Sequence, residues 1–158
     1  LETLEYVYHE TRTWLEITTL LIPGHNDSVR EIETLSRWIV EHLGPEVPLH
    51  FTAFHPDHRM MDTPPTPRGT VRMARTVAKG VGLHHVYTGN VHDPAGQATE
   101  CVGCGTTVIG RDRYMLTDWS LKPTGQCRKC GMSCAGVFER TPGDWGARRQ
   151  RIRVSDYR

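Results

Sequence analysis

The 158-residue sequence lacks several features that would point directly to a class of protein. No apolar run approaches the 18 or more residues of a transmembrane helix, so we expect no membrane segment. Its 19 Lys and Arg nearly balance its 18 Asp and Glu, and a net charge of +1 gives no strong nucleic-acid signal. Apart from one duplicated cysteine motif, the sequence has no internal repeat and no low-complexity tract.

Cysteine is absent from the first 100 residues, and nothing at the N-terminus resembles a secretory signal peptide. We therefore expect a cytoplasmic protein, in which clustered cysteines bind a metal more readily than they form disulfides. The length allows one ordinary core, or a larger α/β part with a small metal-stabilised module.

Two copies of one motif, Cys101-Val-Gly-Cys104-Gly and Cys127-Arg-Lys-Cys130-Gly, contain four of the five cysteines. Each places two thiolates on a tight turn, and its glycine can adopt the positive φ that directs backbone N–H groups toward the sulfurs. We predict a zinc-ribbon or rubredoxin-like module with four metal ligands, although two disulfides remain the alternative. Zinc is favoured over iron only by prevalence. Cys134 is expected to be a small buried residue rather than a ligand or a nucleophile.

Residues 1–92 alternate helix-like and strand-like segments, which indicates an α/β fold with a parallel sheet. The segment at 14–22 has the composition of a nearly buried strand, and Ser28 and Glu31 have capping-box spacing before an amphipathic run. The predicted strands are 14–22, 49–54 and 84–87, and the predicted helices are 1–10, 28–43 and 66–82, with Val29, Ile32, Leu35, Ile39, Leu43, Val71, Ala74, Val77 and Ala78 facing inward.

Three polar loops, 22–27, 54–59 and 87–92, follow the expected strands. Ligands of parallel sheets bind at the carboxyl ends of the strands, so we expect these loops to form one rim of a binding site. They contain four of the nine histidines, and also Asn26, Asp27, Asp57, Arg59 and Asn90. Any single one of these side chains can instead simply cap a turn.

Five motifs occur in a fixed order: Glu16-Ile-Thr-Thr-Leu-Leu-Ile-Pro-Gly24, Asn26-Asp27, His50-Phe-Thr-Ala-Phe-His-Pro-Asp-His58, Tyr87-Thr-Gly-Asn-Val-His92 and the paired cysteine motifs. Together they resemble the C-terminal portion of the AmmeMemoRadiSam-system radical SAM enzymes, which are related to pyruvate formate-lyase activating enzymes. The resemblance extends to about Phe138. It implies a TIM-barrel-like, partial (β/α) barrel that binds a 4Fe–4S iron–sulfur cluster and S-adenosyl-L-methionine (SAM) and generates a 5′-deoxyadenosyl radical.

The same resemblance implies positions for SAM-binding residues, although it identifies no catalytic residue. Thr18 and Leu20 correspond to inward positions of the strand that ends in the Pro-Gly turn, and His55 corresponds to a residue near the adenosyl group. Thr18 stands where related activases often have arginine. Asn90 and His92 are candidates for the rim of the same pocket.

The family's cluster motif, CxxxCxxC, and the first strands of the barrel are absent from this sequence. We therefore expect a C-terminal fragment that is inactive alone, whose first partner is the missing N-terminal half of the barrel and whose substrate is an unidentified protein or small molecule. The alternative is a non-catalytic zinc-ribbon adaptor that binds a protein or nucleic acid. The expected organisation is barrel units at 1–92, a linker at 93–100, the ribbon at 101–140 and a basic tail at 141–158.

Within the ribbon, Thr107–Ile109 and Tyr114–Leu116 flank Gly110–Arg113, which is typical of a β-hairpin. Such a hairpin is too small to be stable alone, so we expect the metal to stabilise it. The tail is rich in arginine and is expected to be a solvated end rather than a docking peptide or nucleic-acid arm. Its arginines are Arg148, Arg149, Arg151, Arg153 and Arg158.

Overall fold

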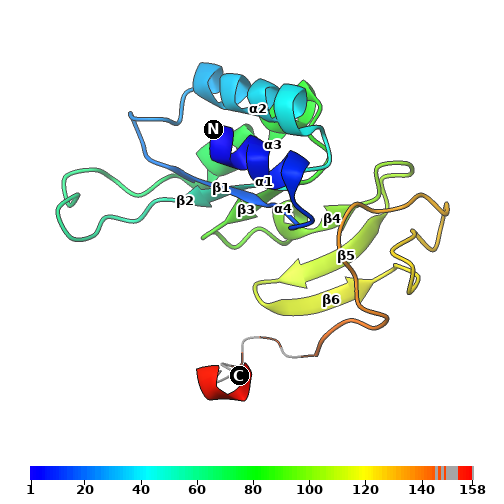
Figure 1. Ribbon diagram of the computed structural model, residues 1–158. Helices are drawn as coiled ribbons and strands as arrows, with labels where there is room; N and C mark the ends of the chain where they lie inside the picture. The colour runs from blue at the N-terminus through cyan, green and yellow to red at the C-terminus, as the bar shows by residue number, and fades with distance from the viewer. Residues whose placement is uncertain (145, 147, 149–152, 158) are drawn as a thin grey trace.

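Two small sheets organise the chain in a computed structural model that describes residues 1–144, 146, 148 and 153–157 (Figure 1). One sheet is parallel and is covered by helices, and the other is antiparallel and adjoins the cysteine motifs. The elements are α1 Glu2–Glu10, β1 Ile17–Leu21, α2 Val29–Leu43, β2 Leu49–Ala53, α3 Arg68–Val81, β3 Val86–Gly89, α4 Pro94–Gln97, β4 Thr99–Glu100, β5 Thr107–Asp112, β6 Met115–Trp119 and η1 Val154–Tyr157. Among the described helices, none has the length and apolar character needed to cross a membrane.

The first sheet has the order β1-β2-β3, and both pairings are parallel, which confirms the predicted α/β pattern. Its register aligns Thr18 with His50 and His50 with Tyr87. Because side chains alternate between the faces of a strand, these three residues share one face. We call this the open face, because α2 and α3 lie on the opposite side of the sheet (Figure 1).

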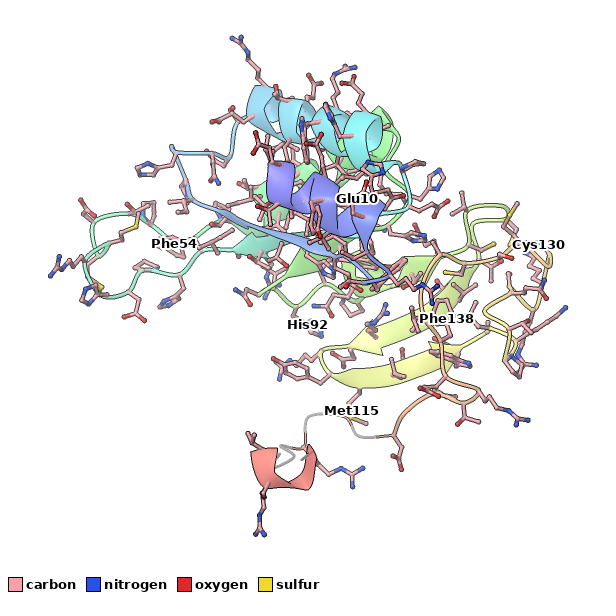
Figure 2. All side chains as sticks on the ribbon, viewed as in Figure 1. Glu10, Phe54, His92, Met115, Cys130 and Phe138 are labelled. Carbon is pink, nitrogen blue, oxygen red and sulfur yellow. The ribbon has the colours of Figure 1, made fainter. Side chains whose placement is uncertain are left out.

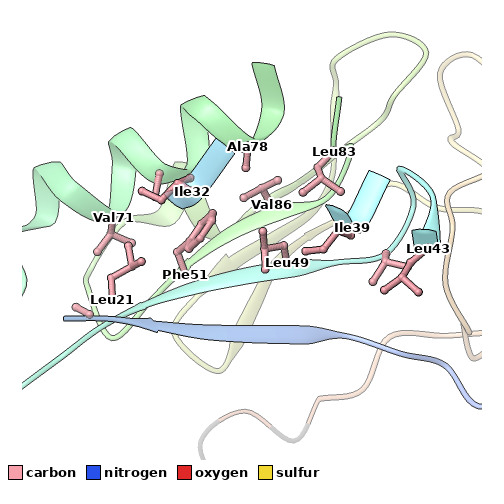
Figure 3. Packing of buried hydrophobic residues seen from close by; sticks show 13 residues of the cluster. Leu21, Ile32, Ile39, Leu43, Leu49, Phe51, Val71, Ala78, Leu83 and Val86 are labelled. Carbon is pink, nitrogen blue, oxygen red and sulfur yellow. The ribbon is translucent and has the colours of Figure 1, made fainter. Parts of the chain in front are cut away.

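The main core lies between the parallel sheet and the helices α2 and α3 (Figure 3). Phe51 in the central strand is fully buried there, and the predicted inward faces of both helices are largely confirmed. Val29 is an exception with 47% exposure, because it begins α2 and the buried positions of that helix start at Ile32. Fully or almost fully buried members of this core are Leu21, Ile32, Ile39, Leu43, Leu49, Phe51, Val71, Ala74, Ala78, Leu83 and Val86.

The start of α2 has the predicted cap. The Ser28 hydroxyl oxygen accepts a hydrogen bond from the Glu31 N–H at 3.3 Å, and the same hydroxyl donates to the Glu31 carboxylate at 2.6 Å. This arrangement satisfies one of the free N–H groups of the first helical turn. It explains why the helix begins at Val29 rather than within the preceding loop.

The first strand is shorter and more exposed than the sequence suggested. β1 lies at the edge of the sheet, and Leu21 is its only fully buried residue, whereas Leu20 is 42% exposed. Trp14, expected within the strand, precedes it and is 40% exposed. The prediction of a nearly buried strand was wrong because the helices cover one face only, so alternate residues of β1 remain accessible.

The third strand begins two residues later than predicted. His84 and His85 precede β3, and both rings lie within hydrogen-bonding distance of Glu46, at 2.8 and 3.1 Å. Burial lowers the pKa of His85, whereas the neighbouring Glu46 carboxylate acts to raise it. These contacts hold the two histidines in the loop that leads into the strand, a tertiary effect that local strand propensity does not reveal.

The segment 93–100 is structured rather than a linker, because it contains α4 and β4, and β4 pairs with β5. Asp93 is buried and accepts hydrogen bonds from Arg72 at 2.8 Å and Thr88 at 3.1 Å. The bond from Arg72 holds the pKa of Asp93 below its usual range. Glu100 forms ion pairs with Arg75 and Lys79. All three basic residues belong to α3, so long-range ion pairs order this polar segment.

The predicted hairpin is present, with longer strands than expected. Residues Gly110–Asp112, assigned to its turn from the sequence, belong to β5 and pair with β6. The turn is reduced to Arg113 and Tyr114, and Arg113 takes a positive φ of 56°. In the basic tail, Arg148 donates to the Asp144 carbonyl at 2.8 Å, whereas Arg149, Arg151 and Arg158 lie outside the described residues.

We predict that Phe51→Ala lowers the free energy of unfolding of the α/β part by about 3–5 kcal/mol, because it leaves a cavity between β2 and the helices. Urea denaturation of the metal-loaded chain, followed by far-UV circular dichroism, measures the change. Thr18→Ala on the open face is the matched control and should change it by no more than about 0.5 kcal/mol. Equal losses in both variants would contradict the one-sided burial of the sheet.

Candidate metal centre and adjoining cleft

Four cysteine sulfurs converge at the base of the antiparallel sheet. The Sγ atoms of Cys101, Cys104, Cys127 and Cys130 all lie within 4.8 Å of one another, and two of the pairs are 3.5 and 3.9 Å apart. A tetrahedral ion with metal–sulfur bonds of about 2.3 Å requires sulfurs about 3.8 Å apart. The arrangement therefore fits a four-coordinate metal ion.

Each cysteine motif forms the turn predicted from the sequence. The Gly105 N–H donates to the Cys101 carbonyl at 2.8 Å, and the Gly131 N–H donates to the Cys127 carbonyl at 2.9 Å. Both glycines have a positive φ, 68° and 79°, which other residues adopt only with strain. The motifs thus place two pairs of sulfurs on one centre although 22 residues separate them.

Electrostatics at the cluster favour a bound cation. Hydrogen bonding between Cys104 and the hydroxyl and N–H of Thr106 lowers the pKa of Cys104 to about 6, and the Cys130 N–H lowers the pKa of Cys127. Cys130 receives a hydrogen bond from the Met132 N–H, yet the crowded neighbouring sulfurs raise the pKa of its thiol to about 12. Four thiolates this close together repel one another, and a bound metal ion would supply the compensating positive charge.

A second small core surrounds the cluster. Cys101 and Cys127 are buried against Val108, Ile109 and Leu121, and Phe138 packs on the same group. The Phe138 ring approaches Gly125 so closely that a Cβ atom there would lie 2.8 Å from the ring. The chain that follows the second motif is therefore fixed to the ribbon up to Phe138.

Cys134 is half-buried and lies outside the four-sulfur cluster. Its Sγ atom lies 3.7 Å from the Ala135 carbonyl, to which the thiol donates. Burial raises the pKa of this thiol to about 11, so it is protonated at neutral pH. A protonated thiol is a poor nucleophile and a poor metal ligand.

The five residues predicted to bind SAM do not form one cluster. Thr18 and Leu20 are exposed on the open face, and the His55 ring lies on the long exposed loop after β2, 2.9 Å from the carbonyl of neighbouring Pro56. Asn90 donates to the Ala53 carbonyl at 3.2 Å and so joins the carboxyl ends of β3 and β2. His92 lies near the turn of the hairpin, at the opposite end from Cys130 (Figure 2).

A cleft of about 950 Å³ separates the open face of the parallel sheet from the β5–β6 hairpin. Of the five predicted SAM residues, Asn90 and His92 line it. Other lining residues were not predicted to be site residues. Glu16, His50 and Tyr87 belong to the motifs quoted from the sequence, whereas Arg111 and Trp119 had no assigned role. One sequence signal could have identified the sheet side of the cleft. His50 and Tyr87 carry polar groups within predicted strands, which suggests that the sheet face they share is not covered by helices.

Side chains on the sheet side of the cleft form a connected network. The Glu16 carboxylate accepts from the Trp14 indole N–H at 2.9 Å and lies 2.8 Å from the His50 Nε2 atom. The His50 ring stacks on Tyr87 with 5.0 Å between the ring centroids. The Tyr87 hydroxyl lies 2.9 Å from the Thr99 hydroxyl, and burial raises the pKa of Tyr87, so its phenol is neutral at physiological pH.

Comparison with known proteins gives one informative relationship. The chain is 39% identical over 121 residues to an uncharacterized protein, MJ0808, from Methanocaldococcus jannaschii, and the match covers 75% of this chain and 36% of that protein. The matched part thus spans about a third of the relative's length. No family model matches the chain, and no solved structure matches it.

We predict that the purified chain binds one metal ion through the four clustered cysteines. Cys104→Ser should lose the metal or bind it much more weakly, because it removes one of the four soft ligands. Elemental analysis after extensive dialysis measures the metal content per chain. Cys134→Ser is the matched control and should retain the full amount; unchanged metal in Cys104→Ser, or loss in Cys134→Ser alone, would refute the site.

Proposed function

We propose that this chain is the C-terminal part of a radical SAM enzyme of the activase type, and that its ribbon metal is zinc. The observation that carries the proposal is the combination of the ordered family motifs with a parallel sheet that has helices on one face only. In a (β/α) barrel the helices surround the strands and the opposite face of the strands lines the interior. The open face corresponds to such an interior.

The chemistry of the open face supports this assignment. His50 and Tyr87 point away from the core on neighbouring strands, and Asn90 and His92 follow at the carboxyl end of β3. Ligands of (β/α) barrels bind at the carboxyl ends of the strands. The role we propose for Asn90 and His92 is to contact the cofactor there, although His55 would have to reorient to take part.

The chain's own cysteines do not fit the 4Fe–4S cluster that such an enzyme needs. When bound, that cluster supplies an electron for reductive cleavage of SAM, and one of its irons must remain open to bind the SAM amino and carboxylate groups. Four converging ribbon sulfurs would leave no open position, and no cysteine precedes Cys101. On this proposal the cluster ligands belong to the N-terminal part of a longer protein.

The length of the M. jannaschii relative is compatible with this view, because the aligned region is only 36% of that protein. A second candidate function is a non-catalytic metal-ribbon adaptor. It is favoured by the fact that the described residues contain one complete cysteine site and no site for a second cluster.

The proposal predicts that the reading frame continues upstream of Leu1 into a CxxxCxxC motif. The longer protein, reconstituted anaerobically with iron and sulfide, should show a cluster by EPR and should release 5′-deoxyadenosine from SAM. The 158-residue chain treated in the same way is the control and should do neither. A start codon immediately before Leu1, or SAM cleavage by the 158-residue chain itself, would contradict the proposal.

A further inference from the structure

The cleft between the open face and the hairpin has the dimensions of a ligand site. Its volume of about 950 Å³ lies near the upper end of the roughly 300–1,000 Å³ typical of small-molecule pockets. The sheet contributes His50 and Tyr87, and the ribbon contributes Arg111, Trp119 and Phe138. The cleft therefore exists only while the metal-binding ribbon is folded against the sheet.

The ribbon side of the cleft carries positive charge without a matching carboxylate. Arg111 donates to two neutral acceptors, the Gln97 carbonyl at 3.0 Å and the Thr99 hydroxyl at 2.8 Å. Neither Arg111 nor Arg113 forms an ion pair with a carboxylate among the described residues. Guanidinium groups in such a position favour an anionic ligand, because they bind carboxylate and phosphate with two parallel hydrogen bonds.

The acidic groups near the cleft are already engaged. Glu16 is held by Trp14 and His50, and Asp112 lies 3.3 Å from His92. These contacts reduce the capacity of both carboxylates to neutralise the arginines. The balance of charge that a ligand meets on the ribbon side is therefore positive.

Aromatic rings accompany the two arginines. The Arg111 guanidinium lies 5.6 Å from the centre of the Tyr87 ring, and Trp119 packs edge-on against Phe138 with 6.3 Å between their centroids. Aromatic walls favour a planar ring, which can stack on them or meet their edges. Two arginines and an aromatic wall in one cleft favour a ligand that has both a negative charge and a planar ring.

We propose that the cleft binds an aromatic anion, a planar ring that carries a carboxylate or a phosphate. Arg111 and Arg113 hold the anionic group, and the ring lies against Trp119 and Phe138, because His50 and Arg111 already cover the Tyr87 ring. The inference goes beyond the proposed function, because it uses residues of the ribbon and of the open face and requires neither an iron–sulfur cluster nor SAM. The adaptor alternative would have the same site.

Titration of the metal-loaded 158-residue chain with 2-naphthoate and 2-naphthyl phosphate tests the proposal, with uncharged 2-naphthalenemethanol as the ligand control. NMR spectra should show saturable shifts of the Trp119 indole N–H with both anions, and much weaker shifts with the alcohol. Arg111→Met removes one charged hydrogen-bond donor and should weaken anion binding roughly 10- to 100-fold. Arg113→Gln should weaken it by a smaller factor, because that side chain is exposed at the turn.

Arg111→Met can also loosen the hairpin, so metal content and circular dichroism are measured for each variant. Arg113→Gln tests the role of positive charge independently of the Arg111 contacts. Arg37→Gln is the control variant, because Arg37 is exposed on α2, across the sheet from the cleft. Loss of anion affinity in folded Arg111→Met and Arg113→Gln, with none in Arg37→Gln, would support the site. Equal binding of the alcohol, no saturable shift at Trp119, or equal weakening by Arg37→Gln would overturn it.

Discussion

The ribbon, and with it the cleft, depends above all on the four cysteine sulfurs that converge at one centre. The antiparallel sheet has only three short strands, and its core consists of a few residues around Cys101 and Cys127. A core of this size does not normally stabilise a fold, whereas structural zinc sites contribute about 10–16 kcal/mol of apparent binding free energy. Metal binding would therefore determine whether the hairpin exists, and with it one wall of the cleft.

Ion pairs from α3 determine where the ribbon lies. Arg72 binds Asp93, and Arg75 and Lys79 bind Glu100, immediately before the first metal ligand. These partly buried pairs connect the helix layer to β4 and bring the hairpin beneath the open face. Single exposed ion pairs contribute little, but several pairs in one segment define a position more firmly. The metal and the α3 contacts thus act together on the geometry of the cleft.

The sequence was sufficient to predict features that depend on local patterns. The capping residues Ser28 and Glu31 predicted the start of α2, the glycines of the two cysteine motifs predicted their turns, and the alternation of segments predicted the parallel sheet. The predictions failed where distant residues decide the structure. The segment 93–100 looked like a polar linker because its partners lie on α3, and β1 looked buried because its apolar composition does not show which face is covered.

The candidate site was predictable only where local sequence patterns define it. The metal ligands are defined by spacing within each motif, whereas the cleft is created by the docking of two separate parts of the chain. Arg111 has no distinguishing sequence context, and only the fold places its guanidinium over Tyr87. Asn90 and His92 were expected at a rim because loops at strand ends occupy predictable positions, but their relation to the hairpin was not expected.

Hydrogen–deuterium exchange with and without a chelator tests most directly the claim that the metal organises the ribbon and the cleft. Removal of the metal should abolish amide protection in β5 and β6 and expose Tyr87 and its neighbours on the open face. The central strand β2 should keep its protection, because its core with α2 and α3 contains no metal ligand. Unchanged protection of the hairpin without metal, or simultaneous loss in β2 and the ribbon, would contradict this account.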